Sequence, residues 1–363
     1  MLLKEGEIIR DSYEVERLLG EGAFAEVYRV KHKFLGRQAM KVFKTAGASP
    51  EEIEQMLGEA IILSKIGHPN IIRVFDASVV KTSVGQCGFF TMEYVAGGNL
   101  ENFWRSHGSS FVHVSDTVEI IRQVCRGLSV AHAENPPIIH RDIKPQNILI
   151  GYDAVGLRVR VSDFGLAKKV NPLTLLASAQ GTLAFKPPEF LYDIDSCAGD
   201  VWGIGATFYL LLTDRLPFPL LDKKDFVDEK CWASPLIPAS YFNAQVDTKL
   251  DKILFRALAL KSADRYRDSK DMLEDLMKWE PLQVKNSAQA KGSPDESKFV
   301  LGPISVSQEK TVEKMLFKAL ELSRNSNRLS EAADLLEETL NKDPSLREKY
   351  EYHLKLWRRG IAI

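Results

Sequence analysis

The sequence predicts an α+β fold in which a small β-rich region precedes a larger helical region and an all-α module follows. Residues 13–42 alternate apolar and polar side chains in short runs between glycine-bearing turns, the pattern of an antiparallel meander. Beyond Gly98, apolar residues recur at intervals of three and four, which is the helical period. Residues 283–308 are rich in small and polar residues and predict a linker before the last module, 309–363.

The individual elements follow from the same periodicities. In the β-rich region a helix is expected at 50–66, and strand-like runs follow at 71–75 and 89–94. In the helical region, helices are expected at 114–134, 200–213, 248–260 and 269–279. The stretch 201–213 (VWGIGATFYLLLT) is the most apolar of the chain but too short to cross a bilayer, so it predicts a buried helix.

The composition excludes several classes of protein. Hydrophobic residues make up 45% and charged residues 27% of the 363 residues, the balance of a soluble globular protein. The 48 lysines and arginines nearly cancel the 49 acidic residues, so we expect neither nucleic acid nor a membrane as a partner. The four cysteines are widely spaced and form no Cys-x-x-Cys pair, which indicates neither a zinc site nor a disulfide framework.

The start of the chain carries no pattern of an export signal. Charges interrupt residues 1–15 before an apolar core of signal-peptide length can form. We therefore expect a cytoplasmic protein.

A glycine-bearing turn, GEGAFAEV at 20–27, lies between two predicted strands. Glycines there let backbone N–H groups approach phosphate oxygens, because no Cβ stands in the way. Hairpins also use glycine for turn geometry alone, so this motif leaves two interpretations open.

A lysine on the third predicted strand needs a partner. Lys41 stands in the apolar run AMKVF, where an unpaired ammonium group would be costly. Glu59, on the helix that follows, is the candidate counter-charge. The alternative, an acidic residue on an exposed helix face, applies better to Glu51, Glu52 and Glu54.

The segment 139–149 (IHRDIKPQNIL), followed by Asp163-Phe164-Gly165, carries the strongest chemical signal. Phosphoryl transfer needs a carboxylate that accepts a hydroxyl proton, oxygen ligands for a metal ion, and a cation near the transferred phosphate. Asp142 supplies the carboxylate, Lys144 the cation, and Asn147 and Asp163 the hard oxygen ligands that Mg²⁺ prefers.

With these motifs, residues 1–282 resemble a eukaryotic-type (Hanks-type) serine/threonine protein kinase domain. The resemblance implies a bilobal kinase fold, with an N-lobe at 1–95 and a helical C-lobe at 96–282. It implies transfer of the γ-phosphate of ATP to serine or threonine of a protein substrate, autophosphorylation, and dependence on Mg²⁺, with Mn²⁺ as an alternative ion. Lys144 and Thr182 are typical of the serine/threonine class.

The resemblance also assigns roles to residues. Those implied to contact the nucleotide are Gly20, Glu21, Gly22, Ala23, Val27, Ala39, Lys41, Met92, Glu93, Val95 and Leu149. Those implied in catalysis are Asp142, Lys144, Lys41, Glu59 and Thr182, with Asn147 and Asp163 as metal ligands. Those implied in regulation are Arg141 and the candidate phosphate acceptors Thr174 and Ser178.

Further members of the motif set are implied to be structural. An ion pair is expected between Glu189 and Arg265, and Asp200 is expected to bind the backbone of the catalytic loop. The chain departs from the family pattern where Ala25 replaces a glycine and where GTLAFKPPE (181–189) carries Phe185 and Pro187.

The last module is expected to hold three helices. Its segment LSEAADLLEETLNKDP (329–344) resembles the second helix of a tetratricopeptide repeat, with Ala332, Leu336 and Pro344 at the expected spacing. One repeat cannot bury its own core, so a protein partner, a second copy of the chain or the kinase domain must cover it. A generic helical hairpin packed on the large lobe is an equal alternative.

Two other functions compete with an active protein kinase. A pseudokinase scaffold would bind nucleotide and recruit partners through 309–363, but Lys41, Asp142, Asn147 and Asp163 are all present. A small-molecule kinase of similar fold is disfavoured by Lys144 and by the complete 181–189 segment, which in the family shapes a protein-substrate groove.

Overall fold

The computed structural model divides into two compact units, residues 1–282 and 283–363, and each is described here by itself. The structure describes residues 1–44, 50–107, 111–153, 156–164, 183–218, 232, 234–281, 315–316, 318–323, 328–342, 350, 354 and 357. Within helix α1 (Pro50–Lys65), the side chain of Glu59 is among those that lie outside this description.

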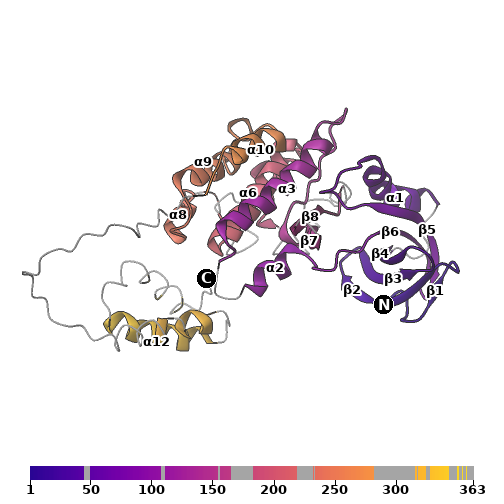
Figure 1. Cartoon of the computed structure of the whole chain (residues 1–363), viewed down its shortest axis with the longest axis horizontal. Helices are drawn as coiled ribbons and strands as arrows, with labels where there is room; N and C mark the ends of the chain where they lie inside the picture. The colour runs from indigo at the N-terminus through magenta and orange to yellow at the C-terminus, as the bar shows by residue number, and fades with distance from the viewer. Residues whose placement is uncertain are drawn as a thin grey trace, which may run out of the picture. The chain divides into compact units, whose positions relative to one another are not determined.

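The first unit begins with a six-stranded antiparallel sheet of order β1-β2-β3-β4-β6-β5 (Figure 1). Its strands are β1 Ile8–Ile9, β2 Tyr13–Glu21, β3 Ala25–His32, β4 Gly36–Phe43, β5 Val74–Thr82 and β6 Gly85–Glu93. The meander predicted for 13–42 is therefore confirmed. The strand predicted at 71–75 is misplaced, because β5 begins at Val74 and Ile71 forms only an isolated bridge with Val161.

The two faces of this sheet are both buried, which explains why alternation alone did not mark every strand. On β4, Met40 and Val42 belong to one hydrophobic cluster, while Ala39 and Phe43 belong to another. Helix α1 packs on β5 and β6. Lys41 lies between Met40 and Val42 in sequence and so points to the face shared by Ala39 and Phe43.

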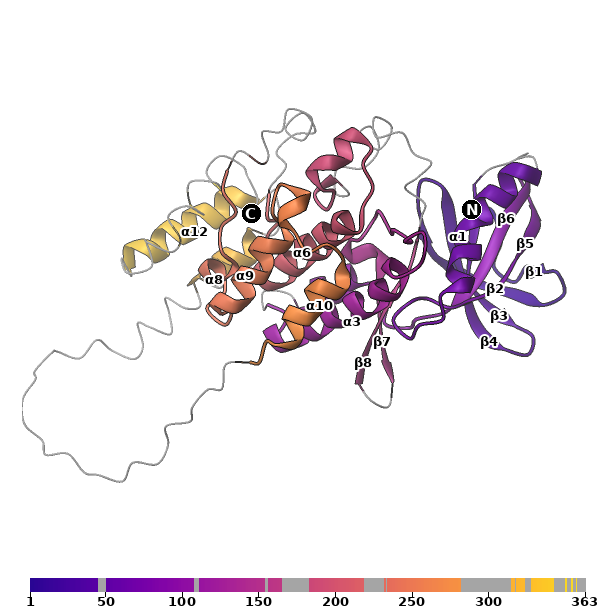
Figure 2. The same ribbon diagram turned by 90° about the horizontal axis from the view of Figure 1, so that it is seen from above.

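The second part of this unit is mainly helical. Its helices are α2 Leu100–Ser106, α3 Val114–His132, α6 Cys197–Thr213, α8 Ala239–Phe242, α9 Thr248–Ala257 and α10 Ser269–Met277. Figure 2 shows α3, α6 and α10 side by side, and all three are in mutual contact. A hairpin of β7 (Ile148–Asp153) and β8 (Gly156–Val161) contacts α3 through β8, and it was not predicted.

Helix α6 is the centre of the helical part. Every residue from Asp200 to Thr213 is buried, so the prediction of a buried helix at 200–213 is confirmed. Ser196 caps its first turn by accepting a hydrogen bond from Gly199 N. Asp200, in the first turn of this helix, accepts hydrogen bonds from the loop that precedes β7.

Two glycines allow helices to approach this loop and its neighbours. A Cβ on Gly203 of α6 would lie 2.8 Å from the carbonyl oxygen of Ile143, and one on Gly127 of α3 would lie 2.8 Å from that of Asn70. Both distances are below those that real Cβ atoms show. The close packing therefore needs glycine at both positions.

In the second unit, helix α12 (Leu329–Lys342) lies within the segment that resembles a repeat helix. Its buried residues Ala332, Ala333, Leu336 and Leu340 form a cluster that also contains Trp357. The other helices predicted for 309–363 fall largely outside the described residues.

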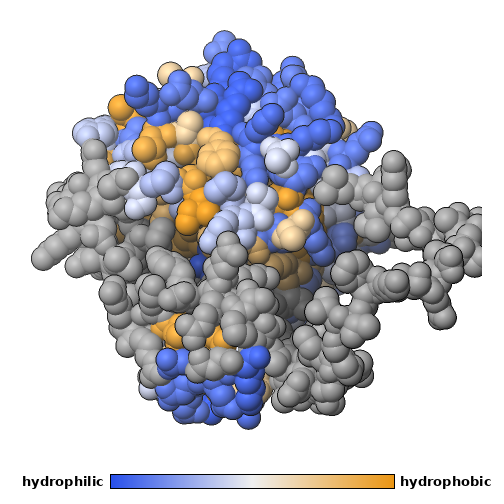
Figure 3. Space-filling model, turned by 90° about the vertical axis from the view of Figure 1, so that its left-hand side faces the viewer, coloured by the Kyte–Doolittle hydropathy of each residue, from blue (hydrophilic) through white to orange (hydrophobic). Residues whose placement is uncertain are grey.

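Figure 3 shows hydrophobic patches among hydrophilic areas on one face of the space-filling view. The large exposed apolar residues described between 234 and 281 are Ile237, Tyr241, Phe255, Leu260 and Met277. Scattered exposure of this kind is ordinary for a folded domain. Within the part of the chain that the structure describes, no helix has the length and hydropathy needed to span a membrane.

Candidate active site

The loop between α3 and β7 carries Asp142, and Asp200 of α6 holds its backbone. The carboxylate of Asp200 accepts hydrogen bonds from His140 N (2.7 Å to Oδ2) and Arg141 N (2.7 Å to Oδ1). Arg141 has a left-handed backbone with φ of 70°, which costs about 1 kcal/mol for a residue other than glycine. The two hydrogen bonds offset that cost, and the expected role of Asp200 is confirmed.

His140 fixes the other side of the same loop. Its Nε2 lies 2.7 Å from the carbonyl oxygen of Ser162. Because a carbonyl oxygen can only accept a hydrogen bond, Nε2 carries the proton. Its Nδ1 accepts from Asp142 N at 3.2 Å, and its ring lies 4.5 Å from that of Phe164. Burial lowers the pKa of His140, which keeps the imidazole neutral and this tautomer in place.

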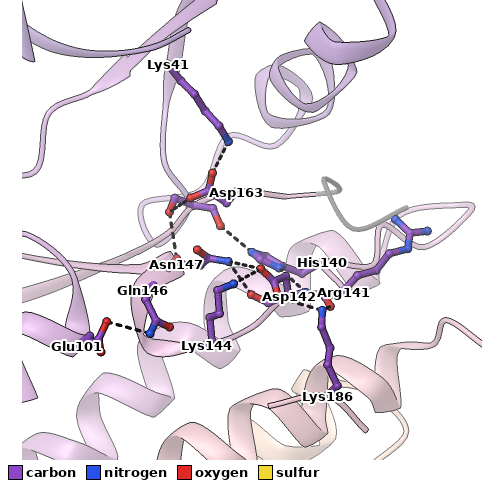
Figure 4. Close-up of polar contacts among 11 residues, drawn as sticks. Lys41, Glu101, His140, Arg141, Asp142, Lys144, Gln146, Asn147, Asp163 and Lys186 are labelled. Carbon is purple, nitrogen blue, oxygen red and sulfur yellow. Dashed lines mark hydrogen bonds and ion pairs between the residues drawn. The ribbon is translucent and has the colours of Figure 1, made fainter. Parts of the chain in front are cut away.

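The Asp142 carboxylate is held by three groups (Figure 4). Lys144 Nζ lies 2.7 Å and Asn147 Nδ2 3.0 Å from Oδ2, while Lys186 Nζ lies 2.9 Å from Oδ1. Burial alone would raise the pKa of Asp142, but the charges of Lys186 and Lys144 outweigh it and hold that pKa well below its usual range. The carboxylate is therefore ionised and fixed in direction.

Lys186 was not among the predicted site residues. Its side chain is 3% exposed and donates to the Arg141 carbonyl oxygen at 2.7 Å as well as to Asp142. The sequence does hold a signal, because Lys186 stands between Phe185 and two prolines. A lysine in apolar surroundings needs a partner, the reasoning that identified Lys41.

Lys41 and Asp163 form an ion pair above this loop (Figure 4). Lys41 is buried on β4, and Asp163 follows β8 with a left-handed φ of 63°. Burial would raise the pKa of Asp163, but the Lys41 ammonium group outweighs it and lowers that pKa. The predicted contact of Lys41 with Glu59 lies outside the described side chains.

Asn147 and Asp163 fit a magnesium site by the chemistry of their donors. The Asn147 amide nitrogen donates to both the backbone oxygen and Oδ2 of Asp142, at 2.8 and 3.0 Å. The orientation of the amide is thereby fixed, and its oxygen faces away from these two acceptors. One amide oxygen and one carboxylate suit an ion that binds few protein ligands together with phosphate oxygens.

The residues implied to contact the nucleotide come from five strands and from the segments after β2 and β6. Gly20 and Glu21 end β2, and Gly22 N donates to Ala25 O at 2.8 Å, which closes the turn around Ala23.

Strand pairing and packing bring the apolar members of this set together. Val27 pairs with Lys41, and Ala39 pairs with Met92 across the sheet. Ala39 and Met92 lie in one hydrophobic cluster, against which Val27, Val95 and Leu149 pack. The Glu93 side chain accepts hydrogen bonds from Arg160 at 2.8 and 2.9 Å, and the Glu93 N–H donates to the Arg73 carbonyl oxygen at 2.9 Å.

Arg141, the predicted phosphate-binding residue, is paired with Asp195 at 2.5 Å. Thr174, Ser178 and Thr182 lie outside the described residues. The predicted pair of Glu189 and Arg265 is confirmed, with two hydrogen bonds of 2.5 and 2.7 Å.

Comparison with known proteins gives consistent matches. A family model described as a protein kinase domain matches residues 13–355. Serine/threonine-protein kinase PknB of Mycobacterium leprae is 30% identical over 276 residues, 74% of this chain and 43% of that protein. Serine/threonine-protein kinase ATG1b of Arabidopsis thaliana is 34% identical over 220 residues, 59% of this chain and 29% of that protein. The chain spans less than half the length of the curated relatives it matches.

Solved structures give the same fold. The kinase domain of Mycobacterium tuberculosis PknI superposes with a TM-score of 0.57 at 24% sequence identity, covering 76% of this chain and 99% of that one. At this level of identity the likeness is one of fold. It confirms the predicted β-rich lobe followed by a helical lobe.

Proposed function

Because the chain belongs to the protein kinase domain family, we propose that it is an active serine/threonine protein kinase that transfers the γ-phosphate of ATP to protein hydroxyl groups and phosphorylates itself. The observation that carries the proposal is the arrangement around Asp142. An ionised carboxylate lies between two ammonium groups, and a second carboxylate, Asp163, is paired with buried Lys41.

Each of these groups has a task in the proposed reaction. Asp142 orients the attacking hydroxyl group and accepts its proton, while Lys144 remains close enough to stabilise negative charge on the transferred phosphate. Lys41 binds phosphate oxygens, and Asn147 and Asp163 hold Mg²⁺, with Mn²⁺ as an alternative ion. The ion supplies neutralisation of phosphate charge.

Labelled ATP with magnesium and a generic protein substrate tests the proposal. Asp163→Asn and Asp142→Asn should each lower the rate on the order of a hundredfold or more, because a metal ligand or the hydroxyl-orienting group is lost. Equal incorporation by wild type and both variants would contradict kinase activity and favour a nucleotide-binding scaffold. Phosphopeptide analysis of the wild-type product separates serine and threonine from tyrosine.

We also propose a cytoplasmic protein with a kinase domain at 1–282, a linker at 283–308 and a tetratricopeptide-like module at 309–363 that contacts a protein partner or a second copy. Support comes from α12, which buries small residues, Ala332 and Ala333, beside Leu336 and Leu340. Small residues on a helix face allow close helix packing. Light scattering of the full chain tests self-association, and a monomer at all concentrations excludes a second copy and leaves a different protein or the kinase domain to cover the module.

A further inference from the structure

The Asp142 carboxylate has few acceptor sites left. A carboxylate offers about four lone-pair sites. Lys144 and Asn147 donate to Oδ2, and Lys186 donates to Oδ1. Among the described residues these are the donors to the two side-chain oxygens, so about one site remains, on Oδ1. The Lys186 ammonium group donates to the other lone pair of Oδ1 and thereby fixes the direction in which the remaining lone pair points.

Lys186 is held rigidly enough to do this. Its ammonium group also donates to Arg141 O at 2.7 Å and lies 5.2 Å from the centre of the Phe190 ring. Three residues later, Glu189 is bound through both oxygens by Arg265, whose side chain is fully buried. A bidentate pair of this kind fixes position as well as charge. The lysine is therefore placed by the fold, not by a flexible tail.

Burial makes the contact with Asp142 obligatory for Lys186. At 3% exposure the ammonium group cannot be hydrated, and leaving a buried charge without its partner is strongly unfavourable. The Lys144 side chain, by comparison, is 16% exposed. The two lysines thus differ in exposure, and Lys186 is the one whose charge depends on Asp142.

We propose that Lys186 is a positioning residue for phosphoryl transfer, which aims the remaining lone pair of Asp142 Oδ1 at the attacking hydroxyl group; this rests on the proposed kinase function. In the step it serves, the substrate oxygen forms a bond to the γ-phosphorus as the bond from that phosphorus to the β-phosphate oxygen breaks. The hydroxyl proton passes to Asp142 Oδ1, and ADP leaves with the electron pair of the broken bond.

Substitution of Lys186 tests the role in the full-length chain. Lys186→Met keeps the length of the stem and removes the charge, while Lys186→Arg keeps the charge. Lys270→Met, at an exposed position of α10, is the matched control. Initial rates with varied ATP and varied protein substrate give kcat and both KM values, and nucleotide binding gives the fraction of folded sites.

The expected result is a fall in kcat per folded site on the order of a hundredfold in Lys186→Met, with KM for ATP changed less than about twofold. Lys186→Arg should recover at least about a tenth of wild-type kcat, and Lys270→Met should equal wild type. A purely structural lysine would change the folded fraction and leave kcat per folded site unchanged.

The experiment distinguishes failure of the proposed Lys186 role from failure of the proposed kinase function. A Lys186→Met kcat within about threefold of wild type, in an active wild type, overturns the role of Lys186 and leaves the kinase function intact. A wild type no faster than Asp142→Asn overturns the kinase function itself. If Lys186→Met does not fold, Lys186→Gln replaces it, with the same expected fall in kcat and the same refuting result.

Discussion

The regulatory role predicted for Arg141 depends on the group that this side chain contacts. An arginine beside the catalytic carboxylate is a site where a phosphate can bind and order a loop. Here the partner of Arg141 is Asp195, with 2.5 Å between Nε and Oδ2. A carboxylate from the segment after Glu189 therefore already supplies a negative charge of the kind that a phosphate would bring.

Replacing Asp195 should make activity depend on phosphorylation. In Asp195→Asn, the kcat of phosphatase-treated enzyme should fall about threefold to tenfold, because Arg141 loses a charged partner worth about 1 kcal/mol. Treatment that allows autophosphorylation should restore it. The control is Asp193→Asn, since Asp193 has a left-handed φ of 56° that asparagine also tolerates. Equal rates of dephosphorylated wild type and Asp195→Asn would contradict the role of Asp195.

The residue scale is also where sequence reasoning was strongest. Asp142, Lys144, Asn147, Lys41 and Asp163 could be predicted as site residues because phosphoryl transfer demands those residue types, and the structure joins them by direct contacts. The contact between Lys186 and Asp142 could not be predicted, because a contact between residues more than forty positions apart leaves no periodic pattern in the sequence. Only the apolar neighbours of the lysine hinted that it had a partner.

At the scale of elements, the turn between α1 and β5 shows how a loop is tied to the helical part. Asn70 is buried and donates to Gln123 Oε1 of α3 and to the Val159 carbonyl oxygen of β8, both at 2.9 Å. Its own N–H donates to His68 Nδ1 at 3.1 Å. The turn therefore depends on a neutral imidazole, because a protonated His68 could not accept this hydrogen bond.

This arrangement predicts a pH dependence of stability. Burial, together with nearby Arg126, lowers the pKa of His68 in the folded chain. A lowered pKa means that the stabilisation is present above the unfolded value of about 6.5 and is lost as pH falls below it. His68→Asn keeps an acceptor for the same N–H and does not titrate. Denaturant unfolding should show a smaller loss of stability from pH 7.5 to 5.5 in this variant, and identical losses would contradict the prediction.

The contact of α6 with the catalytic loop predicts the effect of a single methyl group. In Gly203→Ala the new Cβ would lie 2.8 Å from the Ile143 carbonyl oxygen, so the loop or the helix must move. We expect a loss of about 1–3 kcal/mol in unfolding free energy, together with a lower kcat, because Ile143 adjoins Asp142. Thermal unfolding and initial rates measure both.

Gly58→Ala is the control for that change. Gly58 lies in α1, where a Cβ meets nothing within 4 Å. Alanine should stabilise this helix by about 0.5–1 kcal/mol. If Gly203→Ala matched this gain, the close approach of α6 to the loop would be excluded.

Helices were predictable where one face is apolar, as in α3, or where a long apolar run is bounded by charges, as in α6. Helix α3 has one apolar face and was expected almost where it lies, at 114–134 against Val114–His132. The hairpin of β7 and β8 was not predicted although its buried residues alternate, because each strand is only six residues long. Strand β5 was predicted only in part, because its apolar residues do not alternate. Periodicity carries no signal where tertiary contacts decide burial.

At the scale of the whole molecule, the first unit is one fold assembled from distant parts of the chain. Asn70 is bonded to α3 and β8, Asp200 to the loop before β7, and Glu189 to Arg265. The active-site residues thus come from both lobes, with Lys41 on the sheet and Asp142 among the helices. All of these contacts can form only when nearly the whole of residues 1–282 is present.

The complete burial of α6 has a consequence for how the chain is made. As the ribosome releases the chain, α6 emerges before α9 and α10, two of the helices that cover it in the finished fold. Until Ser269–Met277 has left the exit tunnel, an apolar helix has no full cover and is prone to aggregate or to recruit chaperones. The helical lobe can therefore become native only after α10 has been synthesised, whatever the order in which the sheet forms.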